Sequence, residues 1–293
     1  MIETAPTRMP HPAAIRATAA RHARDYLMCP PTHFTVGYSI NPWMDPRVPV
    51  DTARAMRQWE QLRLTYLALG HTVALIDPVP GLPDMVFAAN GGTVIGGKVL
   101  GARFRHPERA AEAGAYLKWF RDNGWPVREP LVTNEGEGDL VCAGRAVIAG
   151  HGFRSDPAAR IELEELFGLP VVSVRLVDPR FYHLDTALCV VDADTAAYYP
   201  GAFDRAGRAA IAALFGDLIE ATQQEAALLA LNAVSDGHHV VLAAGAPLLA
   251  AELAARGFEP VPVEMSEFRK AGGGPKCCTL ELRGTGSEAG RAA

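Results

Sequence analysis

The sequence predicts an α/β fold in which a strand–strand–helix–strand unit recurs four or five times within one domain. Extended and helical patterns alternate along most of the 293 residues. Short glycine-containing turns join neighbouring strands into hairpins, and no long Gly/Ser linker divides the chain. A doubly wound sheet would have longer apolar strands and a phosphate-binding loop. Gly272, Gly273 and Gly274 do not open a helix, which argues against such a loop.

The first half of the chain supplies the elements of about two units. In chain order we expect a strand at 33–38, a helix at 51–69, a strand at 72–76, a hairpin at 92–101 and a helix at 107–123. Asp51 is placed to cap the first helix, because its carboxylate can accept hydrogen bonds from the first turn. Gly70 and Gly124 follow the two helices and are typical helix ends.

The second half repeats the same pattern. The expected elements are a hairpin at 140–149, a helix at 156–167, a strand at 171–174, a hairpin at 188–199, a helix at 204–215 and strands at 218–220, 239–243, 259–263 and 278–282, with a helix at 247–256. Residues 1–28 are rich in Ala, Arg and Pro, and we expect a flexible N-terminal segment. The domain is expected at 29–284 and a flexible tail at 285–293.

Composition narrows the classes of function. The 28 basic and 33 acidic residues give a net charge of −5 without a basic cluster, so nucleic acid is not an expected partner. No apolar run reaches the roughly 18 residues of a membrane span, and the N-terminus lacks the apolar core of a signal peptide. Five cysteines, an odd number, do not form a disulfide framework. We therefore expect a cytoplasmic protein.

Three compact segments carry reactive side chains. Cys277 follows the glycines at 272–274, His183 and Asp185 lie within 181–186, and several acids lie within 134–139. Each segment adjoins an apolar run typical of a buried strand, which suits a site where several strands end. Taken singly, each residue also has a structural explanation. A histidine before a strand is more often structural, a paired cysteine is usually a buried apolar residue, and acids among glycines often form turns.

At these residues the chain resembles the guanidino-group-modifying superfamily, and most closely its dimethylarginine dimethylaminohydrolase branch. Relatives include the arginine deiminases, the arginine dihydrolases and the amidinotransferases. The shared motifs are Gly-Gly-Gly-x-x-Cys, His-Leu-Asp-Thr, an acidic Gly-Asp segment and Pro-Asp-x-Val-Phe at 83–87, and the resemblance covers about 34–282. It implies a pentein-type propeller of five modules with pseudo-fivefold symmetry around a central active site. This agrees with the repeat read from the residues alone.

The resemblance also implies roles for individual residues. The catalytic residues would be Cys277 as nucleophile, His183 as general acid and base, and Glu135 as the acid that binds the guanidinium. The substrate-binding residues would be Asp84, Asn90, Arg103, Glu137, Arg154 and Asp185, with the arginines holding the substrate carboxylate.

Two departures from the family pattern affect these assignments. The segment Glu-Gly-Glu-Gly-Asp at 135–139 is one residue longer than usual, so either glutamate could be the guanidinium-binding acid. Glu135 is preferred because its place on the strand side of the segment matches that of the guanidinium-binding acid in the family. Asn90 is a neutral amide where relatives usually carry an aspartate, and this resembles the arginine dihydrolase branch.

The implied chemistry is hydrolysis at a guanidino carbon. A Cys277 thiolate attacks this carbon, His183 protonates the departing amine, and water releases a ureido product from a thiouronium on sulfur. Dimethylarginine, giving citrulline and dimethylamine, is the favoured substrate. The alternatives are arginine dihydrolysis or deimination, amidino transfer, and a catalytically silent propeller that binds arginine.

The expected partner is a small guanidino molecule, and the protein is expected to be a monomer or a homodimer. No cofactor or metal is expected, because Cys29, Cys142 and Cys189 are not spaced as zinc ligands. The pair His238-His239 follows Asp236-Gly237 and precedes an apolar run. A metal site is conceivable there, but the pattern favours a turn that enters a strand.

Overall fold

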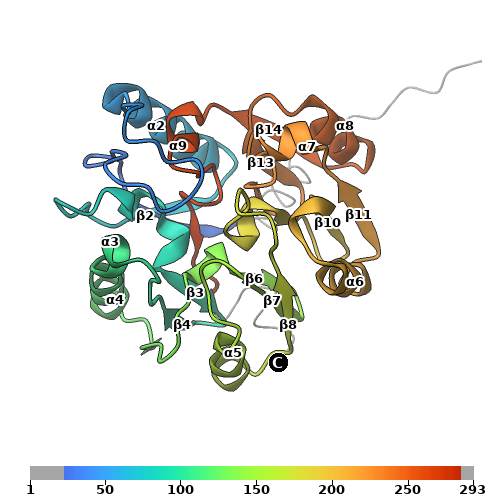
Figure 1. Ribbon diagram of the computed structural model, residues 1–293, viewed down its shortest axis with the longest axis horizontal. Coiled ribbons are helices and arrows are strands. Elements are labelled where there is room, and N and C mark those ends of the chain that lie inside the picture. The colour runs from blue at the N-terminus through green and yellow to red at the C-terminus, as the bar shows by residue number, and fades with distance from the viewer. Residues whose placement is uncertain (1–22, 285–293) are drawn as a thin grey trace, which may run out of the picture.

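Five small sheets surround the centre of the molecule, and the helices lie on its outside (Figure 1). A computed structural model describes residues 23–284, so the expected flexible segments fall largely outside the described residues. Each sheet has three strands. The predicted α/β propeller of five strand–strand–helix–strand modules is confirmed.

Within every sheet the middle strand pairs antiparallel with one neighbour and parallel with the other. The strands of four sheets, in chain order, are β3 (Gly92–Ile95), β4 (Lys98–Gly101) and β5 (Val127–Arg128); β6 (Leu140–Ala143), β7 (Ala146–His151) and β8 (Val171–Arg175); β9 (Leu188–Val190), β10 (Thr195–Tyr198) and β11 (Asp217–Glu220); β12 (Val234–Ser235), β13 (His239–Ala243) and β14 (Glu259–Val263). A tight turn can join an antiparallel pair, but a parallel pair needs a crossover.

The remaining sheet joins the two ends of the described chain. Its order is β15 (Leu280–Glu281), β1 (Asp25–Met28) and β2 (Thr72–Leu75). The Leu282 amide also donates to the Asp25 carbonyl at 2.7 Å. The first module is therefore completed by the segment that follows Cys277, which ties the cysteine turn into the closure of the ring.

Each crossover between parallel strands contains one longer helix. The longer helices are α2 (Thr52–Ala68), α4 (Glu112–Asp122), α5 (Ala159–Phe167), α6 (Arg205–Leu214) and α8 (Pro247–Ala255), and the single-turn helices are α3 (Pro107–Ala110), α7 (Gln223–Ala226) and α9 (Ser266–Arg269). The β4–β5 crossover also contains the single-turn helix α3. The predicted cap is confirmed, since the Asp51 side chain accepts from the Arg54 amide. Of the residues described, no helix is long and apolar enough to cross a membrane.

Short 3₁₀ turns precede the first strand of three modules. They are η2 (Ala88–Gly91) before β3, η3 (Gly136–Gly138) before β6 and η4 (Leu184–Thr186) before β9, with η1 (Pro83–Val86) just ahead of η2 and η5 (Pro200–Ala202) after β10. The turn η3 contacts both η2 and η4. Together with η1, these turns carry three of the four motifs to the centre of the molecule.

The middle strand of each sheet is buried on both faces. On β7, Val147 and Ile148 are fully buried yet belong to two different apolar clusters. Leu27 and Met28 on β1 likewise belong to two different apolar clusters. Successive side chains on a strand point to opposite faces, so one short strand supports two cores.

Two predictions about the N-terminal region are wrong. The strand expected at 33–38 is an irregular segment, although Phe34 and Val36 are buried in alternation and fit an apolar cluster. Alternating burial shows that the segment has one buried face, but it does not show that a neighbouring strand is hydrogen-bonded to the segment. The first strand is Asp25–Met28, so the folded unit begins before the expected boundary at residue 29.

Three element boundaries also differ from prediction. The helix expected at 107–123 is two helices that meet at Ala111. The helix expected at 156–167 begins at Ala159. The last strand begins at Leu280, so Cys277 and Cys278 lie in a turn and not on a strand. Strand alternation therefore does not decide which way the two thiols point.

Candidate active site

The turn that carries Cys277 packs directly against aromatic rings. Gly272 has a positive φ of 80°, and a Cβ there would lie 2.9 Å from the Tyr182 ring. A Cβ on Gly273 would lie 2.2 Å from the Phe87 ring. Glycine supplies both the left-handed backbone and the missing atoms. The glycine run in the sequence thus lets the thiol-bearing turn reach the centre.

Asn232 and Asp185 hold the Cys277 thiol. The Asn232 side chain donates to Cys277 Sγ at 3.1 Å, and its oxygen accepts from the Cys277 amide at 2.9 Å. The thiol donates to Asp185 Oδ2 at 3.4 Å. Burial, and then the Asp185 carboxyl, raise the pKa of Cys277 well above its ordinary value. Without a bound cation, this sulfur is therefore a neutral thiol.

His183, Glu135 and Arg154 form a buried ionic group. His183 Nε2 lies 2.7 Å from Glu135 Oε2, and Arg154 donates to the same oxygen at 2.9 Å. The Arg105 amide donates to the other oxygen at 3.1 Å. Burial opposes ionisation of Glu135, but Arg154 and His183 outweigh it and hold the pKa of this carboxyl well below its ordinary value. Glu135 is therefore an anion in contact with the histidine.

The structure separates the two glutamates between which the sequence could not decide. Glu137 accepts from Lys276 Nζ at 2.6 Å and from the Glu281 amide at 3.2 Å, and it is also paired with Arg283. Both of its oxygens are engaged by these partners. The prediction that Glu137 binds substrate is therefore not supported, whereas Glu135 lies beside His183.

Asp84 lies within a second polar cluster. Tyr38 donates to Asp84 Oδ2 at 2.7 Å. Arg109 donates to the Asp84 carbonyl at 3.2 Å and is held by Glu112 through two bonds of 3.0 and 2.8 Å. All four are polar, and Asp84, Arg109 and Glu112 are buried. The paired cations and anions make this burial tolerable.

Asn90 links the Asp84 cluster to the Glu135 cluster. Its oxygen accepts from Arg109 at 2.8 Å, and its nitrogen donates to the Glu135 carbonyl at 3.0 Å. An aspartate has no N–H to donate to the Glu135 carbonyl, and its negative charge would repel that oxygen. The neutral amide at this position therefore makes hydrogen bonds within the protein through both its oxygen and its nitrogen.

The two arginines expected at the substrate carboxylate lie in different surroundings. Arg154 is buried, with its guanidinium on Glu135 and 4.6 Å from the centre of the Tyr182 ring. Arg103 is exposed and donates to the Leu131 carbonyl at 2.7 Å. The Arg103 backbone pairs with Asn134, the residue before Glu135, but its guanidinium is bonded to Leu131 in this structure, so its role in substrate binding stays a prediction. A spacing argument could not distinguish Arg103 from the arginines that follow it.

Three buried polar atoms in this region lack a hydrogen-bond partner among the described residues. They are Asp84 Oδ1, His183 Nδ1 and Asp185 Oδ1. Burial raises the pKa of Asp185 to about 6 and also raises the pKa of Asp84. Buried polar atoms are nearly always paired, so unpaired ones point to a ligand. Two carboxylate oxygens with no donor fit a ligand rich in N–H groups.

The segment 38–43 covers this centre. Tyr38 is bonded to Asp84, and the Trp43 indole donates to the Arg180 carbonyl at 2.8 Å. These contacts join the first module to residues just ahead of η4. Cys277 is only 2% exposed, and His183 and Glu135 are 0% exposed. A substrate can reach the thiol only if a covering segment moves.

A separate cavity of about 360 Å³ lies against the Glu137 cluster. Its lining includes Asp185, Lys276 and Arg283, but neither Cys277 nor His183 nor Glu135. Asp185 therefore borders both regions. The volume of this cavity is not evidence for the substrate pocket, because the reactive atoms do not face it.

Sequence reasoning missed Asn232 and Arg109. Asn232 interrupts an apolar run at 226–234, and a lone amide in such a run is a signal for a buried, paired polar group. Arg109 stands three residues before Glu112, the spacing of an ion pair on one helix face. Neither signal specifies which motif the residue will meet.

Comparison with protein families places most of the chain in one of them. The family described as "N,N dimethylarginine dimethylhydrolase, eukaryotic" matches residues 42–284. An N(G),N(G)-dimethylarginine dimethylaminohydrolase from Mycobacterium tuberculosis is 53% identical over 88% of this chain and 86% of its own length. The bifunctional arginine dihydrolase/ornithine cyclodeaminase AgrE of a Nostoc species is 38% identical over 88% of this chain, which spans 37% of that protein.

Solved structures show the same fold. The N-terminal domain of ArgZ, an arginine dihydrolase, was solved as a cysteine-to-serine variant bound to its substrate. It superposes with a TM-score of 0.85 at 36% identity, over 89% of this chain and 98% of that one. A dimethylarginine dimethylaminohydrolase adduct with S-methyl-L-thiocitrulline gives a TM-score of 0.75 at 20% identity, over 88% of this chain and 99% of that one, and supports the fold alone.

Proposed function

The chain belongs to the N,N-dimethylarginine dimethylhydrolase family, and we propose that it hydrolyses dimethylarginine to citrulline and dimethylamine. The observation that carries this proposal is a set of three buried polar atoms that have no hydrogen-bond partner in the described part of the chain. Within residues 23–284, Asp84 and Asp185 each have an oxygen without a donor, and His183 has a nitrogen without a partner. A guanidinium is planar, cationic and rich in N–H groups, so it can satisfy both carboxylates at once.

Substrate binding activates the nucleophile in this proposal. The Cys277 pKa is raised in the empty site by burial and Asp185. A guanidinium placed between Asp84 and Asp185 adds a positive charge beside the sulfur, so the thiol releases its proton to solvent as the substrate binds and the thiolate remains. Fixing the carbon against the sulfur can also remove several kcal/mol of the barrier, on the order of 7 at best.

The reaction then proceeds in two halves. The Cys277 thiolate forms a bond to the guanidino carbon, and the C–N bond to dimethylamine breaks as His183 delivers a proton to that nitrogen. The thiouronium left on sulfur is attacked by water, from which His183 takes a proton. The C–S bond breaks, and citrulline leaves. Glu135 orients His183 and stabilises its positive charge, and general acid–base help of this kind contributes about 10² to 10⁴ in rate.

The binding roles follow from the same contacts. We propose that Asp84 and Asp185 bind the guanidinium, and that Asn90 and Arg109 hold the Asp84 side of the pocket. Arg154 binds Glu135 in the empty site. It turns to the substrate carboxylate only if this contact loosens when segment 38–43 moves.

The described modules form one catalytic domain in this proposal, because the proposed catalytic residues come from different modules. We also propose a cytoplasmic location. The five free cysteines support it, because thiols stay reduced in that compartment. The protein is proposed to act as a monomer or a homodimer. Light scattering on the purified chain distinguishes these two states.

A second candidate function is arginine dihydrolysis, favoured by the neutral Asn90 and by the likeness to the arginine dihydrolases. Mass spectrometry of the products separates the candidates after incubation with dimethylarginine or with arginine. Our proposal predicts citrulline and dimethylamine from the first. Ornithine and ammonia from arginine as the main reaction would support the second candidate. An amidinated amine acceptor, or no turnover of either guanidine, would contradict both.

A further inference from the structure

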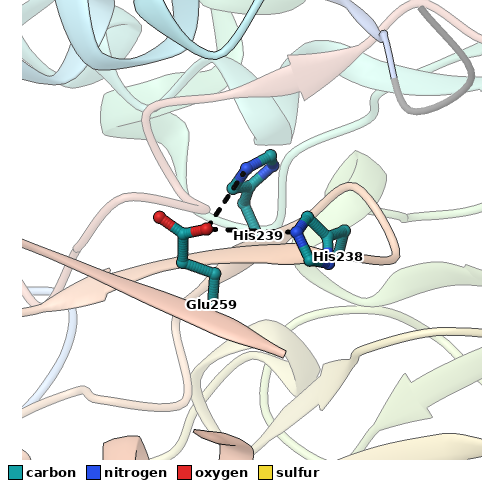
Figure 2. A group of neighbouring side chains, drawn as sticks. All are labelled: His238, His239 and Glu259. Atoms are coloured by element: carbon teal, nitrogen blue, oxygen red, sulfur yellow. Dashed lines mark ion pairs between the residues drawn. The ribbon is translucent and has the colours of Figure 1, made fainter. Parts of the chain in front are cut away.

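His238, His239 and Glu259 bring their ligand atoms together where β13 and β14 begin, at one end of the sheet formed by β12, β13 and β14 (Figure 2). All three atoms lie within 4.8 Å of one another. His238 Nε2 is 3.9 Å and His239 Nε2 is 3.8 Å from the same oxygen, Glu259 Oε2. None of the three residues takes part in the proposed hydrolysis.

Strand register places this group. His239 on β13 lies directly opposite Glu259 on β14, and opposed residues on neighbouring strands share a face. His238 precedes the strand and follows Gly237, whose φ is 89°. The Glu259 amide donates to the His238 carbonyl at 2.8 Å, which holds the turn against β14. The predicted turn that enters a strand is confirmed, and it positions the first imidazole beside the second.

Asp236 supports this arrangement from behind. It is buried, and its Oδ2 lies 2.7 Å from His239 Nδ1. Its Oδ1 accepts from the amides of His238 and His239 at 2.8 and 2.7 Å. A carboxylate that holds Nδ1–H leaves the Nε2 lone pair directed outward, as in histidines that bind metals. The buried Asp236 carboxylate therefore fixes the orientation of the His239 ring and of the turn that carries His238.

We propose that His238, His239 and Glu259 bind a divalent transition-metal ion of the Zn²⁺ type, with water completing the coordination. Two imidazole nitrogens and one carboxylate oxygen suit such ions. Ligand bonds of about 2.0 to 2.1 Å require ligand atoms roughly 3.3 Å apart, so the two imidazole–carboxylate distances of 3.9 and 3.8 Å must each close by about half an ångström. The Glu259 side chain is 63% exposed, so rotation of this side chain can supply the change. The bound ion would fasten the turn to β14.

Titration of the full chain with Zn²⁺ or Co²⁺ tests this proposal. Calorimetry is expected to show one strong equivalent, lost or weakened at least about 100-fold in the double variant His238→Gln/His239→Gln. The conservative change Asp236→Asn is expected to weaken binding about 10- to 100-fold, because it removes the outer carboxylate. His33→Gln replaces a half-buried histidine outside the group and is the matched control, expected to bind as the unchanged chain does.

The Co²⁺ absorption spectrum identifies the ligands independently of affinity. Nitrogen and oxygen ligands give no thiolate charge-transfer band, and Cys277→Ser is expected to leave the spectrum unchanged. The double variant is also expected to retain the catalytic rate. A thiolate band that disappears in Cys277→Ser, equal affinity in the double variant, or the absence of binding would each overturn the proposal.

Discussion

Glu135 and Glu137 are two residues apart, are both buried, and lie in regions that differ in one respect. Around Glu137 each oxygen is matched by a donor from Lys276, Arg283 or the Glu281 amide. Around Glu135 the neighbouring centre contains polar atoms that no other described residue pairs. Burial therefore does not identify the reactive acid. The incomplete pairing of its surroundings does, because a ligand is needed to complete it.

The fully paired region supports the unpaired one. Lys276 precedes Cys277 in the chain, and its ammonium binds both Glu137 and the Thr279 carbonyl, the latter at 3.0 Å. The ion pairs around Glu137 thus hold the ends of the cysteine turn. Variants that affect one region and not the other can test this division.

Replacing the nucleophile is expected to have the largest effect. Cys277→Ser should lower kcat by at least about 10⁴, because a hydroxyl in this buried position is a much weaker nucleophile. Steady-state citrulline release measures the loss. The matched control is Cys278→Ala, since Cys278 is equally buried but lies next to the site. A Cys277→Ser enzyme with near-normal turnover would contradict the comparison.

The two glutamates give the second test. Glu135→Gln should lower kcat by about 10² to 10⁴, since His183 loses the anion that orients it. Glu137→Gln should leave kcat within about tenfold but lower the free energy of unfolding by about 3 kcal/mol, because Lys276 and Arg283 lose a buried partner. Kinetics at a temperature where both are folded, with urea unfolding, separate the effects. Equal loss of kcat in both variants would remove the distinction.

Asp185 borders both regions, and its titration is expected to appear in stability. Its pKa in the folded protein is about 6, above the roughly 3.9 of an unfolded aspartate. The folded state therefore binds more protons between these values, so stability should fall as pH rises from about 4 to 6, by roughly 2 kcal/mol. Asp185→Asn should flatten this part of the profile and be inactive. Urea unfolding across pH measures it, and an unchanged slope would contradict the expectation.

Asn232 is expected to give the smallest effect. Asn232→Ala removes the donor to Cys277 Sγ and the acceptor for the Cys277 amide, so kcat should fall about tenfold. Loss of a bond that favours the thiolate should also move the pH profile of thiol alkylation upward. Rates of iodoacetamide labelling against pH report this shift. A change in stability with an unmoved alkylation profile would assign Asn232 a purely structural role.

Local signals explain what could be predicted from the sequence. Paired glycines mark the hairpin at 92–101, and Asp51 marks the start of α2, because both features act within a few residues. Cys277 and His183 were found because each lies in a short motif beside an apolar run. The structure brings their segments together at the centre.

Long-range pairing explains what could not be predicted. Nothing near Asp25–Met28 reveals that its partners are β2 and β15, the latter more than 250 residues away. Arg109 and Arg103 look alike in the sequence, and only the folded protein places Arg109 on Asn90. The choice between Glu135 and Glu137 likewise depends on distant partners.

Mass spectrometry of the acid-quenched protein during turnover of dimethylarginine tests the central claim most directly. The tryptic peptide that begins at Cys277 contains both neighbouring cysteines, and fragmentation assigns any added mass to one of them. Our account predicts the thiouronium mass on Cys277, and none in the Cys277→Ser protein. Turnover without an adduct on Cys277, or an adduct on Cys278, would contradict it.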